Sequence, residues 1–356
     1  MSAARSRAMA LRDGFAAQGA VIVEPPVLQS AELLLDLYGE DIRSRAYVTS
    51  DALRGEQMLR PDFTVPVVQM HMAQGAEPAR YTYAGTVFRR QEDHADRANE
   101  YLQTGYEIFD RADPASADAE VFALMSNAVA HLNLRAATGD IGILTAAVDG
   151  LQTTERRKAA LRRHIWRPRR FRALLDRFAG RVAIPQSRAA LLAGSATVDA
   201  PLTGLRSAAE IEERINALRT DAASPPISAS EMDGLEALLT MRVTLPKAVE
   251  QLHELTSQLP SISSAVARLE ARIEALERRH IDLERLVFEA SFGRTSMEYY
   301  DGFVFGFYAE ARPDLPAVAS GGRYDALTRR LGQGREIPAV GGVLRPGLLV
   351  ELERDA

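Results

Sequence analysis

Cysteine is absent from this chain of 356 residues, and tryptophan occurs only once. The absence of cysteine excludes disulfides, cysteine-ligated zinc and a cysteine nucleophile, and it suits a reducing cytosol. Apolar runs are also short, since none approaches the ~18 residues that a membrane-spanning helix needs. The formal net charge is −5, so no general attraction to nucleic acid is expected. We therefore expect a cytoplasmic protein that does not contact a membrane.

The distribution of residue types divides the chain into three stretches. Residues 1–149 alternate helical and strand-like segments, residues 150–285 are rich in Arg, Glu, Ala and Leu with a helical pattern, and strand character returns in residues 286–356. At ~100–200 residues per domain, this length allows roughly two domains. The pattern predicts an α+β core, formed by 1–149 and 286–356, that is interrupted by a helical insertion at 150–285.

Individual elements are predicted from composition and spacing. Tyr81 to Phe88 is rich in aromatic and β-branched residues, as strands are. Phe303 to Ala309 is apolar almost throughout, as in a strand that is covered on both faces. Apolar spacing predicts one helix from Asp118 to Leu134 and another that starts near Ser261. The small residues Ser320-Gly321-Gly322 predict a turn.

The candidate binding residues lie in four short segments: Leu59–Thr64, Arg80–Asp110, Met297–Gly302, and Ser320–Asp325 with Pro338–Gly341. In the second segment, Arg89 follows the aromatic strand, and Gln103 and Glu107 share the parity that places side chains on one face of a sheet. Such a face suits a zwitterionic ligand, because Arg pairs with a carboxylate and acidic groups accept from an ammonium. Each residue alone fits a solvated strand face equally well. Together with Asp62 and the Tyr299–Tyr300 pair, the set favours a ligand site.

The order and the sequences of these segments resemble those of the class II aminoacyl-tRNA synthetases. The second segment is similar to their motif 2, and Leu-Arg-Pro-acid-x-Thr, acid-Tyr-Tyr and Gly-Gly-Arg-Tyr-Asp narrow the resemblance to the histidyl-tRNA synthetase family. The resemblance covers residues 10–149 and 286–350. It implies an antiparallel sheet flanked by helices, a helical insertion and self-association as a dimer.

The resemblance also assigns roles around a bound L-histidine. It implies that Asp62, Thr64 and Gln103 hold the ammonium and that Arg89 holds the carboxylate. Tyrosine hydroxyls and a carboxylate would surround the imidazole, whose two ring nitrogens suit such partners. The expected histidine-binding residues are Asp62, Thr64, Arg89, Gln103, Glu107, Tyr299, Tyr300 and Tyr324.

Departures from the synthetase pattern weigh against catalysis. Cations must stabilise charge on the ATP phosphates, and the resemblance places two of the expected arginines at Thr295 and Leu348. Gln91 stands where an adenine-reading Glu is expected. The nearby Arg294 and Arg345 would substitute only through a shift of strand register, which turns a side chain to the wrong face. Losing one such cation commonly costs ~10²–10³ in rate, so we expect no catalytic residues.

A chain of this family that retains amino-acid binding without catalysis resembles the regulatory subunits that partner short-form ATP phosphoribosyltransferase. That enzyme begins histidine biosynthesis, and the resemblance implies feedback regulation by L-histidine. It also implies no cofactor and no metal, and tRNA is not an expected partner, because the chain stops at Ala356, where synthetases of this family continue into an anticodon-binding domain. The alternative is an active histidyl-tRNA synthetase-like class II ligase.

Two further features receive the simpler interpretation. Residues 155–177 are strongly basic and contain Trp166, which fits either a patch for nucleic acid or an acidic partner, or a solvated helix pair. We favour the helix pair, with Leu161, Ile165 and Leu174 directed inward. His94 has acidic neighbours but no second histidine nearby, so no metal site is expected there.

Overall fold

The computed structural model describes residues 2–38, 42–91, 97–194, 203–204, 206–294 and 299–355. The chain divides into two compact units, one formed by residues 1–143, 240–252 and 264–356, the other by residues 144–239 and 253–263. Part of α12 (Leu245–Leu255) and nearly all of α13 (Ser263–Arg278) therefore belong to the first unit. The helical insertion at 150–285 stays a prediction as a domain of its own.

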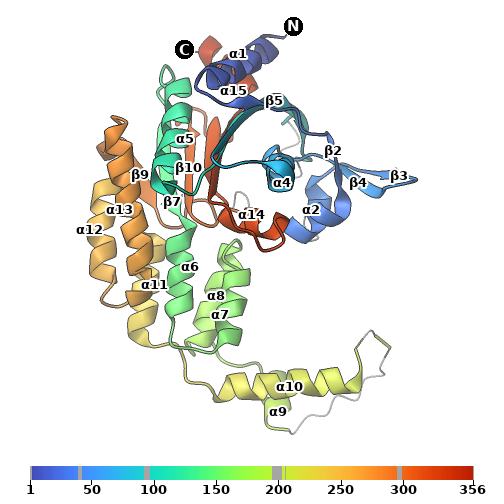
Figure 1. Cartoon of the computed structure of the whole chain (residues 1–356). Coiled ribbons are helices and arrows are strands. Elements are labelled where there is room, and N and C mark those ends of the chain that lie inside the picture. The colour runs from blue at the N-terminus through green and yellow to red at the C-terminus, as the bar shows by residue number, and fades with distance from the viewer. Residues whose placement is uncertain are drawn as a thin grey trace. The chain divides into compact units, whose positions relative to one another are not determined.

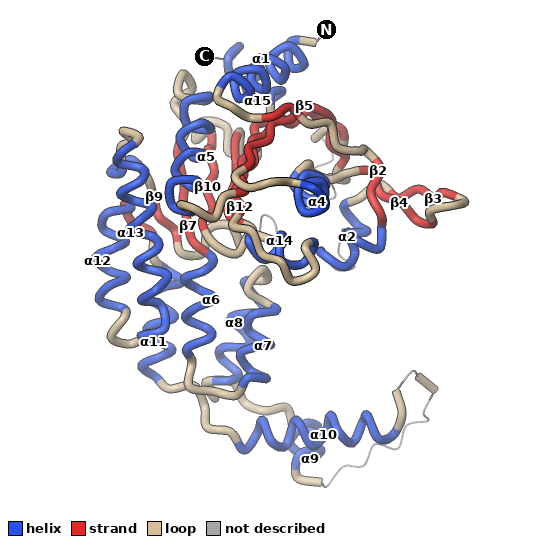
Figure 2. The backbone as a smooth tube through the Cα atoms, viewed as in Figure 1, coloured by secondary structure: helices blue, strands red, loops and turns tan. Residues whose placement is uncertain are grey.

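A nine-stranded sheet, counted over the described residues, forms the centre of the first unit (Figures 1 and 2). Its strand order is β1-β5-β6-β12-β11-β10-β7-β9-β8. The β1–β5 and β7–β9 pairs are parallel, and the other neighbours are antiparallel. The strands are β1 (Val21–Ile22), β5 (Ala79–Phe88), β6 (Glu100–Phe109), β7 (Arg135–Asp140), β8 (Arg242–Thr244), β9 (Val287–Glu289), β10 (Phe303–Tyr308), β11 (Ala319–Arg323) and β12 (Ala339–Leu344).

Helices cover both faces of the central strands. They are α1 (Ala3–Ala17), α4 (Thr64–Gln74), α5 (Pro114–Val129), α14 (Asp325–Leu331) and α15 (Pro346–Asp355). Helices α1, α5 and α15 lie on one face, where Phe15 packs edge-on against Tyr106 of β6. Helices α4 and α14 pack together on the other face, and Figure 1 shows α4 within the curve of the sheet. Because neighbouring residues of a strand face opposite sides, Glu107 points toward α4.

The turn predicted at residues 320–322 is wrong, because these residues lie in β11 in the interior of the sheet. A Cβ atom on Gly321 would lie 2.2 Å from the carbonyl oxygen of Gly341, and one on Gly322 would lie 2.6 Å from that of Phe303. The glycines are therefore required by the close approach of neighbouring backbones, and no chain reversal occurs here.

Two predicted helices differ in detail from the structure. Helix α5 begins at Pro114, before the predicted Asp118, because the Asp113 side chain accepts a hydrogen bond from the Ser116 amide at 2.9 Å and caps the helix. Helix α13 buries Val266 and Leu269, whose spacing is part of the apolar pattern that predicts this helix, and it also buries Arg272. An apolar stripe does not predict a buried arginine, and the partners of Arg272 come from distant segments.

A smaller three-stranded sheet, in the order β2-β4-β3, also belongs to the first unit. Its elements and the adjoining helices are β2 (Leu28–Ser30), β3 (Val48–Asp51), β4 (Gly55–Leu59), α2 (Ala31–Tyr38) and α3 (Ile42–Arg45). Leu53, between β3 and β4, is 96% exposed. Hydrophobic side chains are therefore not all buried in this unit.

The second unit consists of helices and connecting segments, with no strand among its described residues. It contains most of α6 (Ile141–Gly150) and α11 (Ala229–Thr240), together with α7 (Glu155–Arg163), α8 (Pro168–Phe178), α9 (Gln186–Leu192) and α10 (Ala208–Ala223). The basic segment folds as α7 and α8, with Leu161 and Ile165 buried and Leu174 half-buried. Arg157 is also buried and donates to Asp221 at 2.7 Å. This arrangement agrees with the predicted helix pair.

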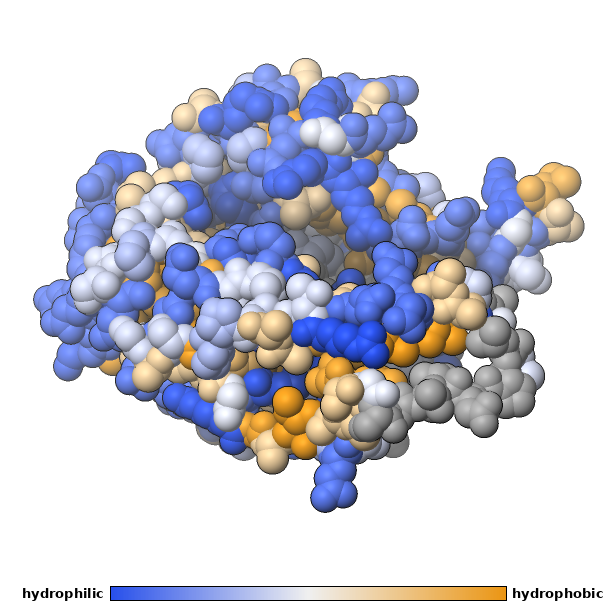
Figure 3. Space-filling model, turned by 90° about the horizontal axis from the view of Figure 1, so that it is seen from below, coloured by the Kyte–Doolittle hydropathy of each residue, from blue (hydrophilic) through white to orange (hydrophobic). Residues whose placement is uncertain are grey.

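The surface is mainly hydrophilic on the face drawn in Figure 3, where apolar residues form small separate groups. No helix among the described residues is both long enough and apolar enough to cross a membrane.

Candidate functional site

A buried carboxylate, that of Glu107 in β6, forms the centre of the candidate site. Its side chain has no exposed surface and accepts three hydrogen bonds. Thr64 Oγ1 and Tyr83 OH donate to Oε1 at 2.9 and 2.7 Å, and Tyr324 OH donates to Oε2 at 2.5 Å. Glu107 and Tyr324 are 217 residues apart in the chain. One carboxylate therefore joins α4, β5, β6 and the segment before α14.

Burial dominates the electrostatics of this carboxylate. It raises the pKa of Glu107 to about 7, against the effect of the three hydroxyl donors and together with the negative charge of Asp62. Burial beside Glu107 also raises the pKa of Tyr83 and of Tyr324 well above the usual value. Both phenols therefore stay protonated at neutral pH and remain donors.

Glycines make room for these side chains on the same face of the sheet. Each glycine lies where a Cβ atom would collide with a site residue. The close pairs are Gly105 with Tyr83 at 2.3 Å, Gly341 with Glu107 at 1.5 Å and Gly322 with Tyr300 at 2.8 Å. The rings and the carboxylate therefore lie directly over the backbones of β6, β12 and β11, so the glycines position them.

Three further predicted residues lie on this side of the sheet. Asp62 precedes α4, is 3% exposed and accepts from the Val65 amide at 3.2 Å. Gln103 is 1% exposed, and its Oε1 has no hydrogen-bond donor within the part of the chain that the structure describes. Arg89 follows β5 and donates from Nε to the carbonyl of Pro61 at 2.6 Å. A buried acceptor without a donor is costly, so Gln103 is suited to receive a hydrogen bond from a ligand.

The predicted tyrosines form one aromatic group. The ring centroid of Tyr299 lies 4.9 Å from that of Tyr300 and 6.1 Å from that of Tyr324. Tyr300 is buried, and burial followed by the charge of Glu107 raises its pKa above the usual range. The segment before β10 thereby lies against Tyr324, one of the hydroxyl donors to Glu107.

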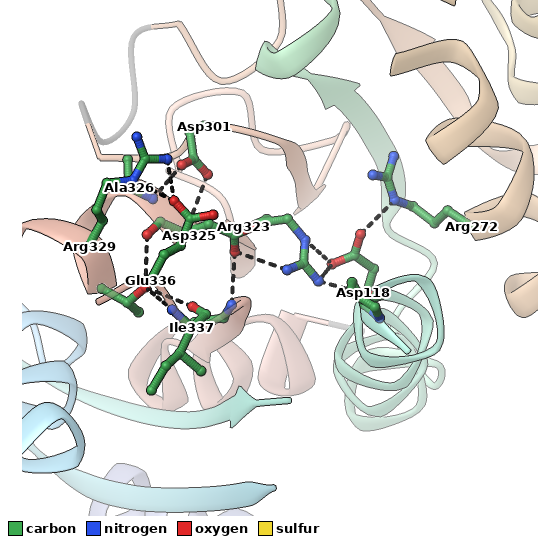
Figure 4. A network of polar contacts seen from close by, with 12 residues as sticks. Asp118, Arg272, Asp301, Arg323, Asp325, Ala326, Arg329, Glu336 and Ile337 are labelled. Carbon is green, nitrogen blue, oxygen red and sulfur yellow. Dashed lines mark hydrogen bonds and ion pairs between the residues drawn. The ribbon is translucent and has the colours of Figure 1, made fainter. Parts of the chain in front are cut away.

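A buried ionic network supports the segments that carry Tyr300 and Tyr324 (Figure 4). Asp118 of α5 accepts from Arg272 Nε at 2.8 Å and from Arg323 Nη2 at 2.7 Å. Arg323 also donates to Asp325 at 3.0 Å. Asp301 accepts from the backbone amides of Asp325 and Ala326 at 3.1 and 2.5 Å. Because Asp301 follows Tyr300 and Arg323 precedes Tyr324, this network fixes both site segments.

Asp301 is the most perturbed carboxyl group of that network. Burial, and then the negative charge of Asp325, raise its pKa to about 7. Its two backbone donors act in the opposite direction. The carboxyl group that holds the start of α14 beside Tyr300 therefore has a pKa raised toward neutral pH.

Tyr83 and Arg345 also lie on the site face, although neither belongs to the predicted set of binding residues. Tyr83 shares parity with Tyr81 and Gly85, so strand alternation places it on the site face, but nothing in the sequence shows that it bonds to Glu107. The sequence analysis considered Arg345 only as a replacement for the arginine expected at Leu348, which would require a register shift, and that expectation stays a prediction. Gly341 faces Glu107 in the regular β12–β6 register, so Arg345, four residues later, leaves the strand on the same side.

Four further residues were named in the sequence analysis, and two of them lie within the described part of the chain. Thr295, which stands at an expected arginine position, and His94, excluded as a metal ligand, lie outside the described residues. Leu348, at the other expected arginine position, lies in the first turn of α15 and is half-buried. Arg294 is buried, with 5% of its surface exposed.

Gly341→Ala should lower the free energy of unfolding by about 1–3 kcal/mol, as overpacking of a well-packed core does. The new methyl group would overlap Glu107 Oε2 and force the carboxylate away from Tyr324. Gly347→Ala is the matched control, because its Cβ would meet nothing within 4 Å. In denaturant titrations we expect the control to keep or slightly raise stability. Equal stability of the two variants would contradict the packing described here.

The raised pKa of Glu107 predicts a pH-dependent difference between the wild type and Glu107→Gln. A carboxyl group whose pKa is about 7 when folded and 4.5 when unfolded stabilises the fold below the unfolded value, and this contribution disappears as pH rises through 7. Glutamine does not titrate. The unfolding free energy of Glu107→Gln minus that of the wild type should therefore increase by about 1–3 kcal/mol from about pH 5 to pH 8. Denaturant titrations at several pH values measure this, and a flat or falling difference would refute it.

Comparison with known proteins identifies a family over nearly the whole chain. The histidyl-tRNA synthetase profile matches residues 1–347. A protein of Brucella anthropi named ATP phosphoribosyltransferase regulatory subunit is 32% identical over 345 residues, which cover 90% of each chain. A protein of Brucella ovis with the same name is 30% identical over 355 residues, which cover 93% of each chain.

Solved structures share the fold at lower identity. A Bacillus halodurans crystal structure described as an ATP phosphoribosyltransferase regulatory subunit/histidyl-tRNA synthetase has a TM-score of 0.68 at 23% identity, covering 98% of this chain and 79% of its own. Histidyl-tRNA synthetase from Nostoc sp. PCC 7120 has a TM-score of 0.65 at 16% identity, covering 98% of this chain and 70% of its own. The core predicted to resemble class II synthetases is thereby confirmed.

Proposed function

The chain belongs to the histidyl-tRNA synthetase-like family of ATP phosphoribosyltransferase regulatory subunits, and we propose that it senses L-histidine for a separate catalytic subunit. In this proposal the partner is a short-form ATP phosphoribosyltransferase, which carries out the first step of histidine biosynthesis. The chain itself catalyses no reaction and conveys feedback regulation. The observation that carries the proposal is the buried Glu107 carboxylate with its hydroxyl donors beside Asp62 and Gln103.

The chemistry of this site suits an amino acid with an imidazole side chain. Asp62 is a buried carboxylate and Gln103 offers a buried acceptor without a donor among the described residues, so both favour a ligand ammonium. The Glu107 carboxylate can accept a hydrogen bond from a ring N–H, and the neighbouring tyrosine hydroxyls can donate one to the other ring nitrogen. Arg89 supplies a cation for the carboxylate. The histidine-binding residues are thus proposed as Asp62, Thr64, Arg89, Gln103, Glu107, Tyr299, Tyr300 and Tyr324.

Reconstitution with a short-form catalytic subunit tests the proposal. We expect the two chains to form a stable complex whose phosphoribosyl transfer to ATP is inhibited by L-histidine. A coupling free energy of ~1–3 kcal/mol between the two sites would be typical. Complexes containing Glu107→Ala or Arg89→Ala should assemble and turn over but respond only to much higher histidine concentrations. Glu100→Ala, an exposed position at the start of the same strand, is the control and should leave the inhibition unchanged.

The possible outcomes of the reconstitution separate two failures. If the chains do not associate, the regulatory function is wrong. If the complex forms but both site variants keep full histidine inhibition, the regulatory role stands and the sensing site lies elsewhere. Dimerisation of this chain, also proposed from the family resemblance, is measured separately by sedimentation of the isolated chain.

An active class II ligase is the second candidate, and Arg345 is the observation that favours it. This arginine lies near Arg89 on the site face and supplies a cation that the expected position at Leu348 lacks. We nevertheless expect no histidine-dependent exchange of pyrophosphate into ATP and no histidyl-tRNA formation by the purified chain. A histidyl-tRNA synthetase assayed in parallel provides the positive control. Exchange that depends on Arg89 would establish the ligase instead.

A further inference from the structure

A second arginine faces the proposed ligand, at the opposite end of the site from Glu107. Leu344 at the end of β12 pairs with Thr104 of β6, so the next residue, Arg345, lies beside Gln103. Gly341 faces Glu107, and residues an even number apart in a strand face the same side. Arg345 therefore follows Gly341 on the site face, next to the Gln103 amide.

The guanidinium of Arg345 is enclosed by groups from three neighbouring segments. Arg345 Nη1 donates to the carbonyl of Ala317, and the Arg345 backbone amide donates to the carbonyl of Val318 at 2.9 Å. Burial lowers its pKa, Tyr101 acts in the opposite direction, and the positive charge of Arg89 lowers it further. Arg89 follows the end of β5 and Arg345 the end of β12, so both lie at the end of the sheet where β6 begins.

This arrangement suits an anion. An anion at this end of the sheet is attracted by two guanidinium groups. A carboxylate fits best, because its two oxygens accept from two guanidinium groups at once. The Gln103 Oε1 next to the pair is an acceptor and cannot bind the anion, but it can accept from a neighbouring ammonium. An α-amino acid carries both groups on one carbon.

The distance along the sheet matches a ligand that also reaches Glu107. Four residues separate Gln103 from Glu107 in β6, which at ~3.3 Å per residue is about 13 Å between their Cα atoms. Both side chains extend over the face and shorten this span. A histidine whose carboxylate lies at the arginines would therefore direct its imidazole toward Glu107.

We propose that Arg345 and Arg89 together bind the α-carboxylate of the amino-acid ligand, with Arg345 acting as a specificity-determining residue. The inference rests on the proposed binding of L-histidine and extends it to a residue outside the family-derived set. It also gives Arg345 a function that does not require phosphate chemistry. The site then distinguishes histidine from imidazole compounds that lack a carboxylate.

The test is calorimetric titration of the full-length chain with L-histidine and with histamine, which lacks only the carboxylate. We expect Arg345→Met to weaken histidine binding by about 10- to 100-fold, as the loss of a charge-assisted hydrogen bond does. Histamine binding should change by less than about 2-fold, since the charge on Arg345 then has no partner on the ligand. Arg345→Lys should recover much of the histidine affinity. Arg312→Met, which removes a half-buried arginine paired with Asp314 and Glu351, is the control and should change neither affinity.

Each other outcome has a definite meaning. If the wild type binds no L-histidine, the proposed function fails before the role of Arg345 is reached. If the wild type binds but Arg345→Met weakens both ligands equally, or neither, Arg345 does not recognise the carboxylate and the inference is overturned. If histamine binds too weakly to measure, or Arg345→Met does not fold, the test is the comparison of Arg345→Lys with Arg345→Gln. Lysine must then retain clearly more histidine affinity than glutamine, and equal affinities overturn the inference.

Discussion

Replacing Glu107 with alanine is expected to weaken the binding of L-histidine by about 100-fold or more. The carboxylate is fully buried and is the shared acceptor for Thr64, Tyr83 and Tyr324. Its removal leaves a bound imidazole N–H without an acceptor in a place that water does not reach. It also leaves three hydroxyl groups without the partner that orients them. Both effects reduce affinity, and neither has a compensating contact in the described structure.

Three variants separate these contributions. Glu107→Gln keeps the volume and one carbonyl acceptor, so we expect a smaller loss than for alanine. Tyr324→Phe removes one donor and keeps Glu107, so we expect about a 10-fold loss, as for one hydrogen bond. Glu100→Ala changes an exposed carboxylate of the same strand and should have no effect. Calorimetric titration of L-histidine measures all of them. Wild-type affinity in a folded Glu107→Ala chain would show that this cluster is structural only.

Two kinds of information predict part of this site: the alternation of side chains along a strand, and the family resemblance. Strand alternation places Gln103 and Glu107 on one face, and the family resemblance brings Thr64 and Tyr324 toward them. The structure places Thr64 and Tyr324 on the Glu107 carboxylate. Tyr83 had the correct parity but no sequence pattern that linked it to the carboxylate. The bond exists because Gly105, on the neighbouring strand, leaves space for the phenol ring.

The errors share a cause, which is that close packing between distant segments is not visible in a sequence. Gly321 and Gly322 have the composition of a turn, but the reason for them is the neighbouring backbone of β10 and β12. Arg272 interrupts an apolar stripe and would be expected to face solvent. Its partners, Asp118 and Asp140, lie 154 and 132 residues away in the chain. No local pattern predicts which carboxylates compensate a buried arginine.

Asp118→Ala is the second change with a large expected effect, about 3–5 kcal/mol of unfolding free energy. Asp118 is 2% exposed and bridges Arg272 and Arg323, which are 4% and 8% exposed. Without it, each arginine keeps one carboxylate among the described residues, Asp140 for Arg272 and Asp325 for Arg323, both at 3.0 Å. Removing one partner of a buried charge costs more than the pair contributes, because the remaining charge is desolvated and incompletely paired.

The measurement must report on the first unit. The only tryptophan, Trp166, lies in the second unit, so its fluorescence does not follow this network. Hydrogen exchange of the amides in β6, β11 and β12 does. The control is Glu56→Ala, which breaks an exposed Arg43–Glu56 pair of similar geometry at 2.8 Å and should change the unfolding free energy little.

The same variant links stability to the site. Arg323 precedes Tyr324, and its carbonyl accepts from the Asp301 amide at 3.0 Å, next to Tyr300. Loss of Asp118 should therefore loosen both tyrosines and weaken L-histidine binding, even in chains that remain folded. Replacing the whole charged group by apolar residues of similar volume can restore stability, but it would not restore the position of these tyrosines. If Asp118→Ala lowers stability by 3–5 kcal/mol and leaves histidine affinity unchanged, the network supports the core without positioning the site.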